Sequence, residues 1–374
     1  MRLLITYPWF YPAYKAGGPV QSVKNTALAM ADGNTDIYIL CSDKELDGTP
    51  IDVERDKWVS YAKGIHVYYY SQSGSKEEIR GIIEALQPDV IFINGIYSLP
   101  YTIYPLLYAG AARKILSVRG MLHPGALSQK KLKKKIFLAA FKFRGLHKKV
   151  EYHATTDDEQ QYVHAHFGKD KKAWVVPNLP NVMSYLPPFE KNRGCVKLVS
   201  VSLISPMKNI LLVLRALQNT HANITYDIYG PVKDSKYWEE CQTAITRMPA
   251  NVKVAYKGEM LPHLVQHALK DSHYFVLPSK SENFGHAIYE ALSSGRPVIT
   301  SHNTPWNGLE EAGAGYNIDP EDTTYFTRMM DKLSEVDNDD YVLASANAKK
   351  YIEQQYNIDN IKERYREMFA IQHS

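Results

Sequence analysis

The sequence is poor in cysteine. Three cysteines, Cys41, Cys195 and Cys241, occur far apart among 374 residues. This spacing provides neither a disulfide framework nor a Cys-x-x-Cys metal pair, so we expect a reducing environment. The first residues, MRLLITYPWFYP, also lack the long apolar run of a signal peptide. Both absences favour a cytoplasmic protein.

An excess of one charge is lacking as well. The chain has 44 Lys and Arg against 40 Asp and Glu, which gives a net charge of +4. That charge is too small to indicate a nucleic-acid partner by itself. Hydrophobic residues make up 45% and charged residues 22%, the usage of a globular protein, which excludes a disordered or fibrous chain. At about 150 residues per domain, the length predicts two or three domains.

Long apolar runs without breaks are missing too. The uncharged stretch between Asp89 and Arg113 contains Pro100 and Pro105. These prolines would break a membrane-spanning helix, which needs about 20 apolar residues. We predict instead a buried strand over residues 89–94, then a turn and a short helix.

Short β-rich apolar runs alternate with amphipathic segments along the chain, which predicts an α/β protein with parallel sheets covered by helices. The expected strands are residues 2–6, 36–41, 65–70, 89–94, 114–118, 153–155, 173–176, 196–201, 224–229, 252–256, 274–277 and 297–300. So many strands strain one open sheet, which rarely exceeds about ten. A proline-rich stretch, residues 177–194, separates two halves that open alike. We expect two facing Rossmann-like domains, residues 1–180 and 195–350, with a ligand cleft between them.

The strongest functional pattern is the segment of residues 278–300. Glu282 follows a strand and Glu290 lies on the next helix, with an offset of about 80° around the helix axis. We predict that both carboxylates line one wall, with the amides of Phe284 and Gly285 between them at the positive end of the helix. Carboxylates suit sugar hydroxyls and the amides suit a phosphate. The alternative is a capping Glu282 and a solvated Glu290.

Within it, SENFGHAIYEALSSGRPVI resembles the E-x7-E segment of the retaining glycosyltransferases of family four, which have the GT-B fold. Further segments resemble that family in the same order: AGGPVQSV, RGMLHPGAL, HATTDDEQ, VVPNLPNV, ISPMKN and NTPWNGLEEAGAGYNI. The resemblance implies transfer of a hexosyl group from a UDP- or GDP-sugar to a saccharide or lipid-linked saccharide, with retention, in bacterial surface polysaccharide or glycan assembly. It also implies that a C-terminal helix, at about residues 355–374, packs on the first domain.

The resemblance also implies roles for the residues of this segment. Glu290 would hold the ribose hydroxyls of the donor, while Glu282 with Asn283, Phe284 and Gly285 would hold the transferred sugar, Glu282 acting in catalysis. No cofactor beyond the donor is expected. No DxD motif follows a suitable strand, so we expect a metal-independent reaction whose leaving group is stabilised by lysine, the glycine loop and helix termini.

Two other loops carry residues suited to a diphosphate. Gly17 and Gly18 precede a helix, where glycine amides approach an anion closely, although such a pair is also typical of a plain turn. Lys208 lies at the start of a helix and would place a cation beside the helix dipole. The alternative is a solvated lysine. The family usually has an arginine five residues before this lysine, and here that position is Leu203.

Arg119 and Lys280 are the side chains expected to compensate for Leu203, unless backbone amides do so. Arg119 stands where the family often has a His-Gly pair, so we expect it to contact the sugar or diphosphate and to act in catalysis together with Lys208. His123 follows four residues later and would contact the acceptor. A lone histidine, however, serves many other roles.

Residues Lys130–Lys149, KKLKKKIFLAAFKFRGLHKK, combine nine Lys or Arg residues with aliphatic and aromatic side chains. A basic helix with an apolar face is typical of binding to an anionic membrane, at about 1 kcal/mol per cation. A solvated basic helix and a nucleic-acid patch are the alternatives. We predict contact with the inner face of the cell membrane and no nucleic acid.

Two other functions share parts of this pattern. A GT-B nucleotide-sugar epimerase needs acid–base carboxylates around the sugar, and the E-x7-E segment argues against it. A weakly active or inactive sugar-nucleotide-binding partner subunit is the non-enzyme alternative, because Leu203 replaces the usual arginine. Turnover of a labelled donor, compared with its binding, would separate this partner subunit from the enzyme.

Overall fold

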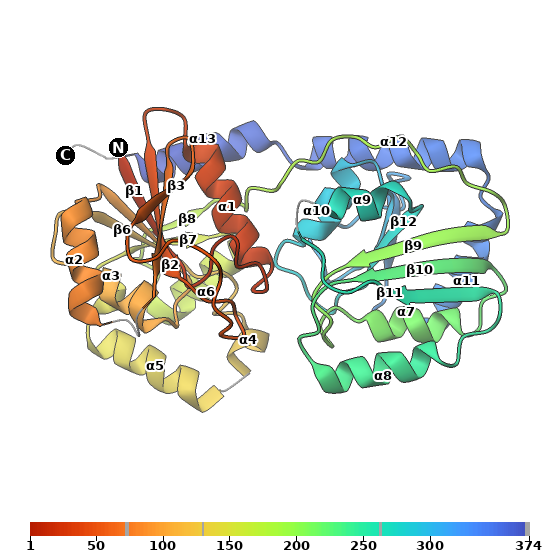
Figure 1. The fold of residues 1–374 in the computed structure, drawn as a ribbon, viewed down its shortest axis with the longest axis horizontal. Coiled ribbons are helices and arrows are strands. Elements are labelled where there is room, and N and C mark those ends of the chain that lie inside the picture. The colour runs from red at the N-terminus through yellow and green to blue at the C-terminus, as the bar shows by residue number, and fades with distance from the viewer. Residues whose placement is uncertain (72–74, 129–130, 262–263, 371–374) are drawn as a thin grey trace. The chain divides into compact units, whose positions relative to one another are not determined.

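The computed structural model describes residues 1–71, 75–128, 131–261 and 264–370, and it divides the chain into two compact units. The N-terminal unit comprises residues 1–179 and the segment from Ile358 onward, and the C-terminal unit comprises residues 180–357. Each unit has a mostly parallel sheet with helices packed against it (Figure 1). The predicted α/β class with two parallel sheets is confirmed.

The N-terminal unit is built on an eight-stranded sheet in the order β3-β4-β2-β1-β5-β6-β7-β8. Its strands are β1 (Arg2–Thr6), β2 (Asp36–Ser42), β3 (Trp58–Ala62), β4 (Ile65–Tyr70), β5 (Val90–Asn94), β6 (Arg113–Ser117), β7 (Glu151–Ala154) and β8 (Ala173–Val175). The edge pair β3–β4 is antiparallel and the other neighbours are parallel. Every residue of the central strand β5 is buried, as expected for a strand covered on both faces.

Helices cover both faces of this sheet. They are α1 (Gly18–Met30), α2 (Lys76–Leu86), α3 (Tyr104–Leu107), α4 (Pro124–Ser128), α5 (Lys131–Phe143), α6 (Asp157–Phe167) and α13 (Ile358–Phe369). Side chains cap α2 and α6: Ser75 accepts from the Glu78 amide at α2, and Thr156 accepts from the Glu159 amide at α6, which is typical of helix N-termini. The last helix, α13, packs its Phe369 ring 5.2 Å from Phe92 of β5.

The C-terminal unit has a six-stranded sheet in the order β11-β10-β9-β12-β13-β14, parallel throughout. Its strands are β9 (Cys195–Val201), β10 (Asn223–Tyr229), β11 (Val252–Tyr256), β12 (Tyr274–Leu277), β13 (Val298–Ser301) and β14 (Gly315–Ile318). Its helices are α7 (Ile210–Leu217), α8 (Ser235–Ile245), α9 (Val265–Lys270), α10 (His286–Ser293), α11 (Thr323–Glu335) and α12 (Asn338–Gln355). The main core lies between the sheet and α7, α8 and α11.

The strand orders place a topological switch point in each sheet. In the N-terminal unit, β1 lies between β2 and β5, and in the C-terminal unit, β9 lies between β10 and β12. Loops that leave neighbouring strands in opposite directions leave a crevice at the carboxyl ends of the strands, where ligands of α/β sheets bind. Gly17 follows β1, Lys208 follows β9, and Glu282 follows β12. Residues predicted to bind the donor therefore follow the switch-point strands.

The uncharged stretch after Asp89 forms β5, a single π-helical turn at Leu99–Ile103 and the short helix α3. This agrees with the predicted strand, turn and short helix. Within the described ranges, no helix combines the length and apolar character needed to cross a membrane.

Candidate functional site

The loops after β9 and β12 meet at the switch point of the C-terminal unit. Lys208 Nζ and Glu282 Oε1 form an ion pair at 2.5 Å, with side-chain exposures of 22% and 10%. The Ser279 hydroxyl donates to the same Glu282 oxygen at 2.7 Å. A backbone hydrogen bond from Lys280 N to Met207 O, 2.8 Å long, joins the two loops. Two side chains predicted to act in catalysis are thus brought together.

This ion pair affects how Lys208 can act on an anion. An ammonium group has three N–H donors, and the described residues supply one acceptor for Lys208, the Glu282 carboxylate. Two donors are therefore left for an incoming group. Lys208 can keep its contact with Glu282, which fixes its position, while it donates to a phosphate oxygen.

The start of α10 is held rigidly by aromatic packing. Gly285 has a φ of 79°, and a Cβ at this position would lie 3.0 Å from Ile288 Cδ1, so glycine is favoured here. The buried Phe284 ring lies 5.3 Å from Trp306 and 5.4 Å from Tyr356 between ring centroids. The Trp306 indole N–H also donates to Phe284 O at 2.5 Å. The backbone at this helix N-terminus therefore has a fixed conformation.

The two glutamates of the segment lie on different elements. Glu290 is on α10 and only 8% exposed, which does not fit a solvated surface residue. Glu282 lies in the preceding loop and does not cap the helix, since α10 begins at His286 with Gly285 as its N-cap. The predicted offset of about 80° between the two glutamates assumed a helix from Glu282 onward. Because Glu282 lies in a loop, that offset does not apply, and the loop sets the position of Glu282. Asn283 is exposed beside it.

Lys280 and Leu203 take separate positions in these loops. Lys280 is exposed and borders a cavity of about 460 Å³, together with Pro206 and Asn209 and the first residues of α7 and α11. Lys208 does not line this cavity. Leu203 is half-buried immediately after β9. Compensation for Leu203 by Lys280 remains a prediction.

In the N-terminal unit, the loop after β1 ends at the two predicted glycines. Gly17 is the N-cap of α1 with a φ of 73°, and no side chain caps the helix. Gly18 is exposed and Pro19 follows within the first turn, which carries no acidic residue. The Gly17 amide donates to Tyr14 O at 2.9 Å and the Val20 amide to Gly17 O at 3.1 Å, so the Gly18 amide is the donor at this N-terminus that suits an anion.

Arg119 follows β6 and is held by two asparagines. Its Nε and Nη2 donate to Asn94 Oδ1 at 3.0 and 2.7 Å, and its Nη1 donates to Asn178 Oδ1. Within the part of the chain that the structure describes, no carboxylate forms an ion pair with this guanidinium. Its charge is therefore fixed in place without being neutralised. The next amide, of Gly120, donates to the buried carboxylate of Glu159.

Sequence reasoning missed these positioning residues. Asn94 ends the apolar strand β5 and is 1% exposed, and a polar residue at the carboxyl end of a buried strand was the available indication. Ser279 likewise follows β12 directly and is fully buried. Asn178 lies in the irregular segment after β8 and had no such pattern.

His123 lies on the surface of the N-terminal unit. Its ring packs edge-on to Tyr162 at 5.6 Å, and its Nδ1 accepts a hydrogen bond from Gly125 N at 3.0 Å. These contacts orient the ring and leave it exposed. The predicted contact with an acceptor remains a prediction.

Comparisons with known proteins agree with this architecture. Residues 187–364 match the family model described as glycosyl transferases group 1. Sucrose-phosphate synthase from Thermosynechococcus elongatus superposes with a TM-score of 0.74 at 14% identity, over 98% of this chain and 99% of that one. The chain has the GT-B fold. The predicted fold class is confirmed.

Two further GT-B neighbours were solved with ligands. HepE from Anabaena, in complex with UDP and glucose, has a TM-score of 0.70 at 15% identity, over 98% of this chain and 99% of that one. A TarM mutant from S. aureus, in complex with fondaparinux, α-GlcNAc-glycerol and UDP, has a TM-score of 0.73 at 13% identity, over 99% of this chain and 100% of that one. No curated protein matches the chain. The match to glycosyl transferases group 1 covers the C-terminal part of the chain, and the structural neighbours share its fold over nearly the whole length.

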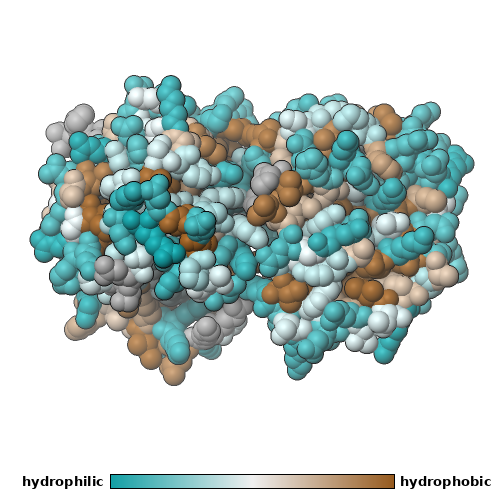
Figure 2. All heavy atoms as spheres, in the orientation of Figure 1, coloured by the Kyte–Doolittle hydropathy of each residue, from teal (hydrophilic) through white to brown (hydrophobic). Residues whose placement is uncertain are grey.

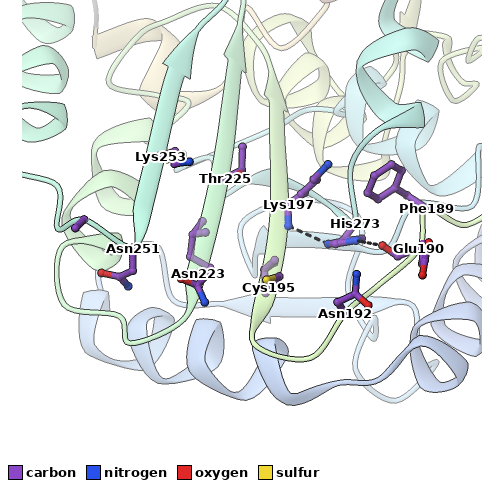
Figure 3. A pocket seen from close by; sticks show the side chains of 13 residues that line it. Phe189, Glu190, Asn192, Cys195, Lys197, Asn223, Thr225, Asn251, Lys253 and His273 are labelled. Carbon is purple, nitrogen blue, oxygen red and sulfur yellow. Dashed lines mark hydrogen bonds between the residues drawn. The ribbon is translucent and has the colours of Figure 1, made fainter.

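A second cavity in the C-terminal unit has a volume of about 510 Å³. It lies at the amino ends of β9, β10 and β11, opposite the carboxyl ends that carry the predicted site (Figure 3). Its polar lining residues include Asn192, Lys197, Asn223, Thr225, Asn251, Lys253 and His273. None of the predicted site residues lines it. Because ligands of parallel α/β sheets bind at the carboxyl ends of the strands, we do not assign the donor to this cavity.

His273 borders this cavity as a neutral imidazole. Its Nδ1 accepts from Lys197 N at 2.9 Å and its Nε2 donates to Glu190 O at 3.0 Å (Figure 3). A second ring proton would break the bond from Lys197, and the side chain is 2% exposed. Burial lowers the pKa of His273 from 6.5 to about 4.

We expect the C-terminal unit to lose stability as the pH falls from 6.5 toward 4. The unfolded chain binds a proton at His273 in this range and the folded chain does not, which costs about 1.4 kcal/mol per pH unit. Urea unfolding of wild type and His273→Gln between pH 7.5 and 5 tests this, with the exposed His221→Gln as control. The His273 variant should show a shallower pH dependence; an unchanged slope would contradict the assignment.

Proposed function

We propose that this protein is a retaining, metal-independent glycosyltransferase. It transfers a hexosyl group from a UDP- or GDP-sugar to a saccharide or lipid-linked saccharide in bacterial surface polysaccharide or glycan assembly. The observation that carries the proposal is the Lys208–Glu282 pair at the switch point, beside the rigid N-terminus of α10. Both residues lie within the segment that matches glycosyl transferases group 1, and HepE and TarM were solved with UDP.

The roles of the site residues follow from their chemistry. Lys208 donates to the leaving diphosphate, and the buried Glu290 accepts hydrogen bonds from the ribose hydroxyls. Glu282 binds the transferred sugar and also positions Lys208. Asn283 and the backbone of Phe284 and Gly285 lie beside Glu282. No cofactor other than the donor is required.

In the N-terminal unit we assign the diphosphate to the turn of Gly17 and Gly18, with the Gly18 amide as its donor, because the Gly17 amide donates to Tyr14 O at 2.9 Å. Arg119 carries a fixed, unneutralised charge, which suits the sugar or its leaving group. His123 is assigned to the acceptor.

The reaction retains the anomeric configuration because the acceptor oxygen attacks from the face that the diphosphate leaves. The bond between the anomeric carbon and the phosphate oxygen breaks, and a bond from the acceptor oxygen to that carbon forms. The acceptor proton passes to the departing phosphate oxygen. Negative charge grows on the diphosphate, so Lys208 stabilises the transition state more than the ground state.

Transfer should continue in excess EDTA, because lysine and helix amides supply the positive charge. A thermal-shift screen of UDP-, GDP- and ADP-sugars first identifies the donor, since binding at 100 times Kd stabilises by about 2.7 kcal/mol. Transfer from that donor to a saccharide acceptor is then followed with and without EDTA. Complete loss in EDTA with recovery in Mn²⁺ would contradict the metal-independent mechanism. Binding without turnover would favour a partner subunit, and donor epimerisation would favour an epimerase.

We also propose that α5 contacts the inner face of the cell membrane. Leu138 and Phe141 of this helix are buried, whereas Leu132, Ile136 and Phe143 are 71%, 61% and 93% exposed. These three share one face, at helical spacings of four and seven residues. Hydrophobic atoms project over α5 at the lower edge of the N-terminal unit (Figure 2). A second apolar face on a basic helix suits an anionic bilayer.

The lysines of α5 differ in availability. Lys133, Lys135 and Lys142 are exposed, Lys142 with its Nζ 5.8 Å from the centroid of the Phe167 ring. Lys134 is half-buried and donates to Ala126 O at 2.6 Å. Lys130 lies outside the described residues. Lys133, Lys135 and Lys142 are therefore the cations to test.

Replacing Lys133, Lys135 and Lys142 with Gln should weaken binding to phosphatidylglycerol-containing vesicles by about two orders of magnitude, at about 1 kcal/mol per cation. Vesicle sedimentation measures this, and donor binding should be unchanged. Phe143→Ser should also weaken the interaction, and Leu343→Ser, at an exposed leucine of the C-terminal unit, should not. Unchanged vesicle binding in the triple variant would retire the membrane assignment.

A further inference from the structure

A shallow pocket of about 480 Å³ lies at the outer edge of the N-terminal sheet, between the edge strands β3 and β4 and the helix α2. Aromatic side chains and carboxylates line it: Trp58, Tyr68 and Tyr70 with Asp56 and Glu78. No residue assigned to glycosyl transfer is among its lining residues. The pocket therefore needs an explanation of its own.

The strand pairing produces the aromatic row. Trp58 of β3 is directly opposite Tyr68 of β4 in the antiparallel register, and Tyr70 lies two residues further along the same face. The Trp58 and Tyr68 rings meet edge-on at 5.4 Å. Trp58 and Tyr68 are half-buried, whereas Tyr70 is 3% exposed. Two ring surfaces thus remain accessible above a buried third.

Helix α2 leaves room above these rings because two of its facing residues, Gly81 and Ala85, are small. Gly81, Ile82 and Ala85 line the pocket together with Glu78, and this spacing puts all four on one helix face. A Cβ at Gly81 would meet nothing within 4 Å. Glycine inside a helix costs about 0.5–1 kcal/mol relative to alanine, and no close packing requires it here. Its effect is to keep the pocket open.

The carboxylates keep capacity to accept further hydrogen bonds. Glu78 accepts from the Tyr70 hydroxyl, and Asp56 accepts from the Ser71 amide and hydroxyl at 3.0 and 2.5 Å. A carboxylate has about four acceptor sites, so both can take more donors. Burial raises the pKa of Tyr68, and the charges of Asp56 and Glu78 raise it further, so its hydroxyl remains a donor.

We propose that this pocket is a second saccharide site, which binds an uncharged sugar unit away from the transfer site. The aromatic faces suit the apolar C–H face of a pyranose, and the carboxylates of Asp56 and Glu78 suit its hydroxyls. Among the described residues, no lysine or arginine lines the pocket, so phosphorylated and acidic sugars are disfavoured. An organic cation is a weaker fit, since the rings of Trp58 and Tyr68 meet edge-on and do not enclose a cage.

The experiment follows the indole N–H signals of the five tryptophans by NMR on the full chain. Maltohexaose, cellohexaose and mannohexaose are titrated in turn, and Trp58→Phe assigns the Trp58 signal. We expect at least one hexasaccharide to shift the Trp58 signal and to leave that of the buried Trp306 in place. No shift with any of the three, or a shift with tetramethylammonium alone, would overturn the proposal.

Substitutions that fill the pocket or remove its carboxylates test the pocket itself. Gly81→Leu fills the pocket and raises helix propensity. This variant should abolish the shift of the Trp58 signal without lowering the melting temperature. Gly81→Ala should reduce the shift by a smaller amount. Asp56→Asn combined with Glu78→Gln should weaken binding about 10-fold. Undiminished binding of the hexasaccharide in both Gly81→Leu and the double variant Asp56→Asn with Glu78→Gln would contradict the site. Transfer to a monosaccharide acceptor should be unchanged in Gly81→Leu, so failure of this site and failure of the transferase proposal are separable.

Discussion

Lys208→Ala should lower turnover by about 100- to 1,000-fold, the loss typical of removing one charge-stabilising donor, about 2.7–4 kcal/mol. The physical reason is that Lys208 is the side-chain cation held at the switch point of the C-terminal unit, by its 2.5 Å contact with Glu282. Turnover is measured at saturating donor and acceptor. Lys236→Ala, at an exposed lysine of α8, should leave turnover unchanged and serves as the matched control.

Removing Lys208 also leaves the partly buried Glu282 Oε1 with the Ser279 hydroxyl as its one remaining donor among the described residues. An unpaired buried charge lowers stability, so the melting temperature of Lys208→Ala must be measured beside its turnover. Lys208→Ala combined with Glu282→Gln removes that charge. If the double variant regains stability and its turnover stays low, the loss of turnover comes from the missing cation at the leaving group and not from lower stability. A double variant with wild-type turnover would contradict the role of Lys208.

Leu203→Arg supplies the arginine that the retaining glycosyltransferases of family four usually have at this position, and it should raise turnover or tighten binding of the nucleoside diphosphate. Position 203 is half-buried after β9. The substitution can therefore lower the stability of the fold, because a buried arginine without a partner is destabilising. Melting temperatures with and without nucleotide separate the two outcomes. Lower stability in both conditions, without tighter binding, would mean that another group replaces the arginine, with Arg119 and Lys280 next to test.

Glu290→Ala should weaken binding of the nucleoside diphosphate by about 10- to 150-fold, because a hydrogen bond to a charged group contributes about 1.5–3 kcal/mol. Calorimetric titration measures this, and Glu290→Gln controls for the lost volume of a residue that is only 8% exposed. Glu282→Gln should instead act mainly on turnover, because Glu282 is assigned to the reacting sugar and to Lys208. Small and equal effects from both glutamates would contradict these roles.

The secondary structure could be predicted where burial makes a local pattern. Strands such as β5 and β9 are apolar runs bounded by turns, and they were predicted to within one or two residues. The edge strand β3 was missed because none of its residues is fully buried. The strand β14 was missed because it begins with Gly315, where a Cβ would lie 1.9 Å from Val298 O. That glycine reflects close packing against β13 and resembles a turn in the sequence alone.

The sequence by itself determined the α/β class and the two mostly parallel sheets, and it indicated the loops proposed to bind the donor, because each depends on residues a few positions apart. Tertiary structure decided which side chains meet. Lys208 and Glu282 are far apart in the chain and pair because β9 and β12 are neighbours in the sheet. Arg119 is fixed by Asn94 and Asn178 through the packing of the N-terminal unit. Strand order depends on how whole sheets and helices pack, and no local pattern encodes it.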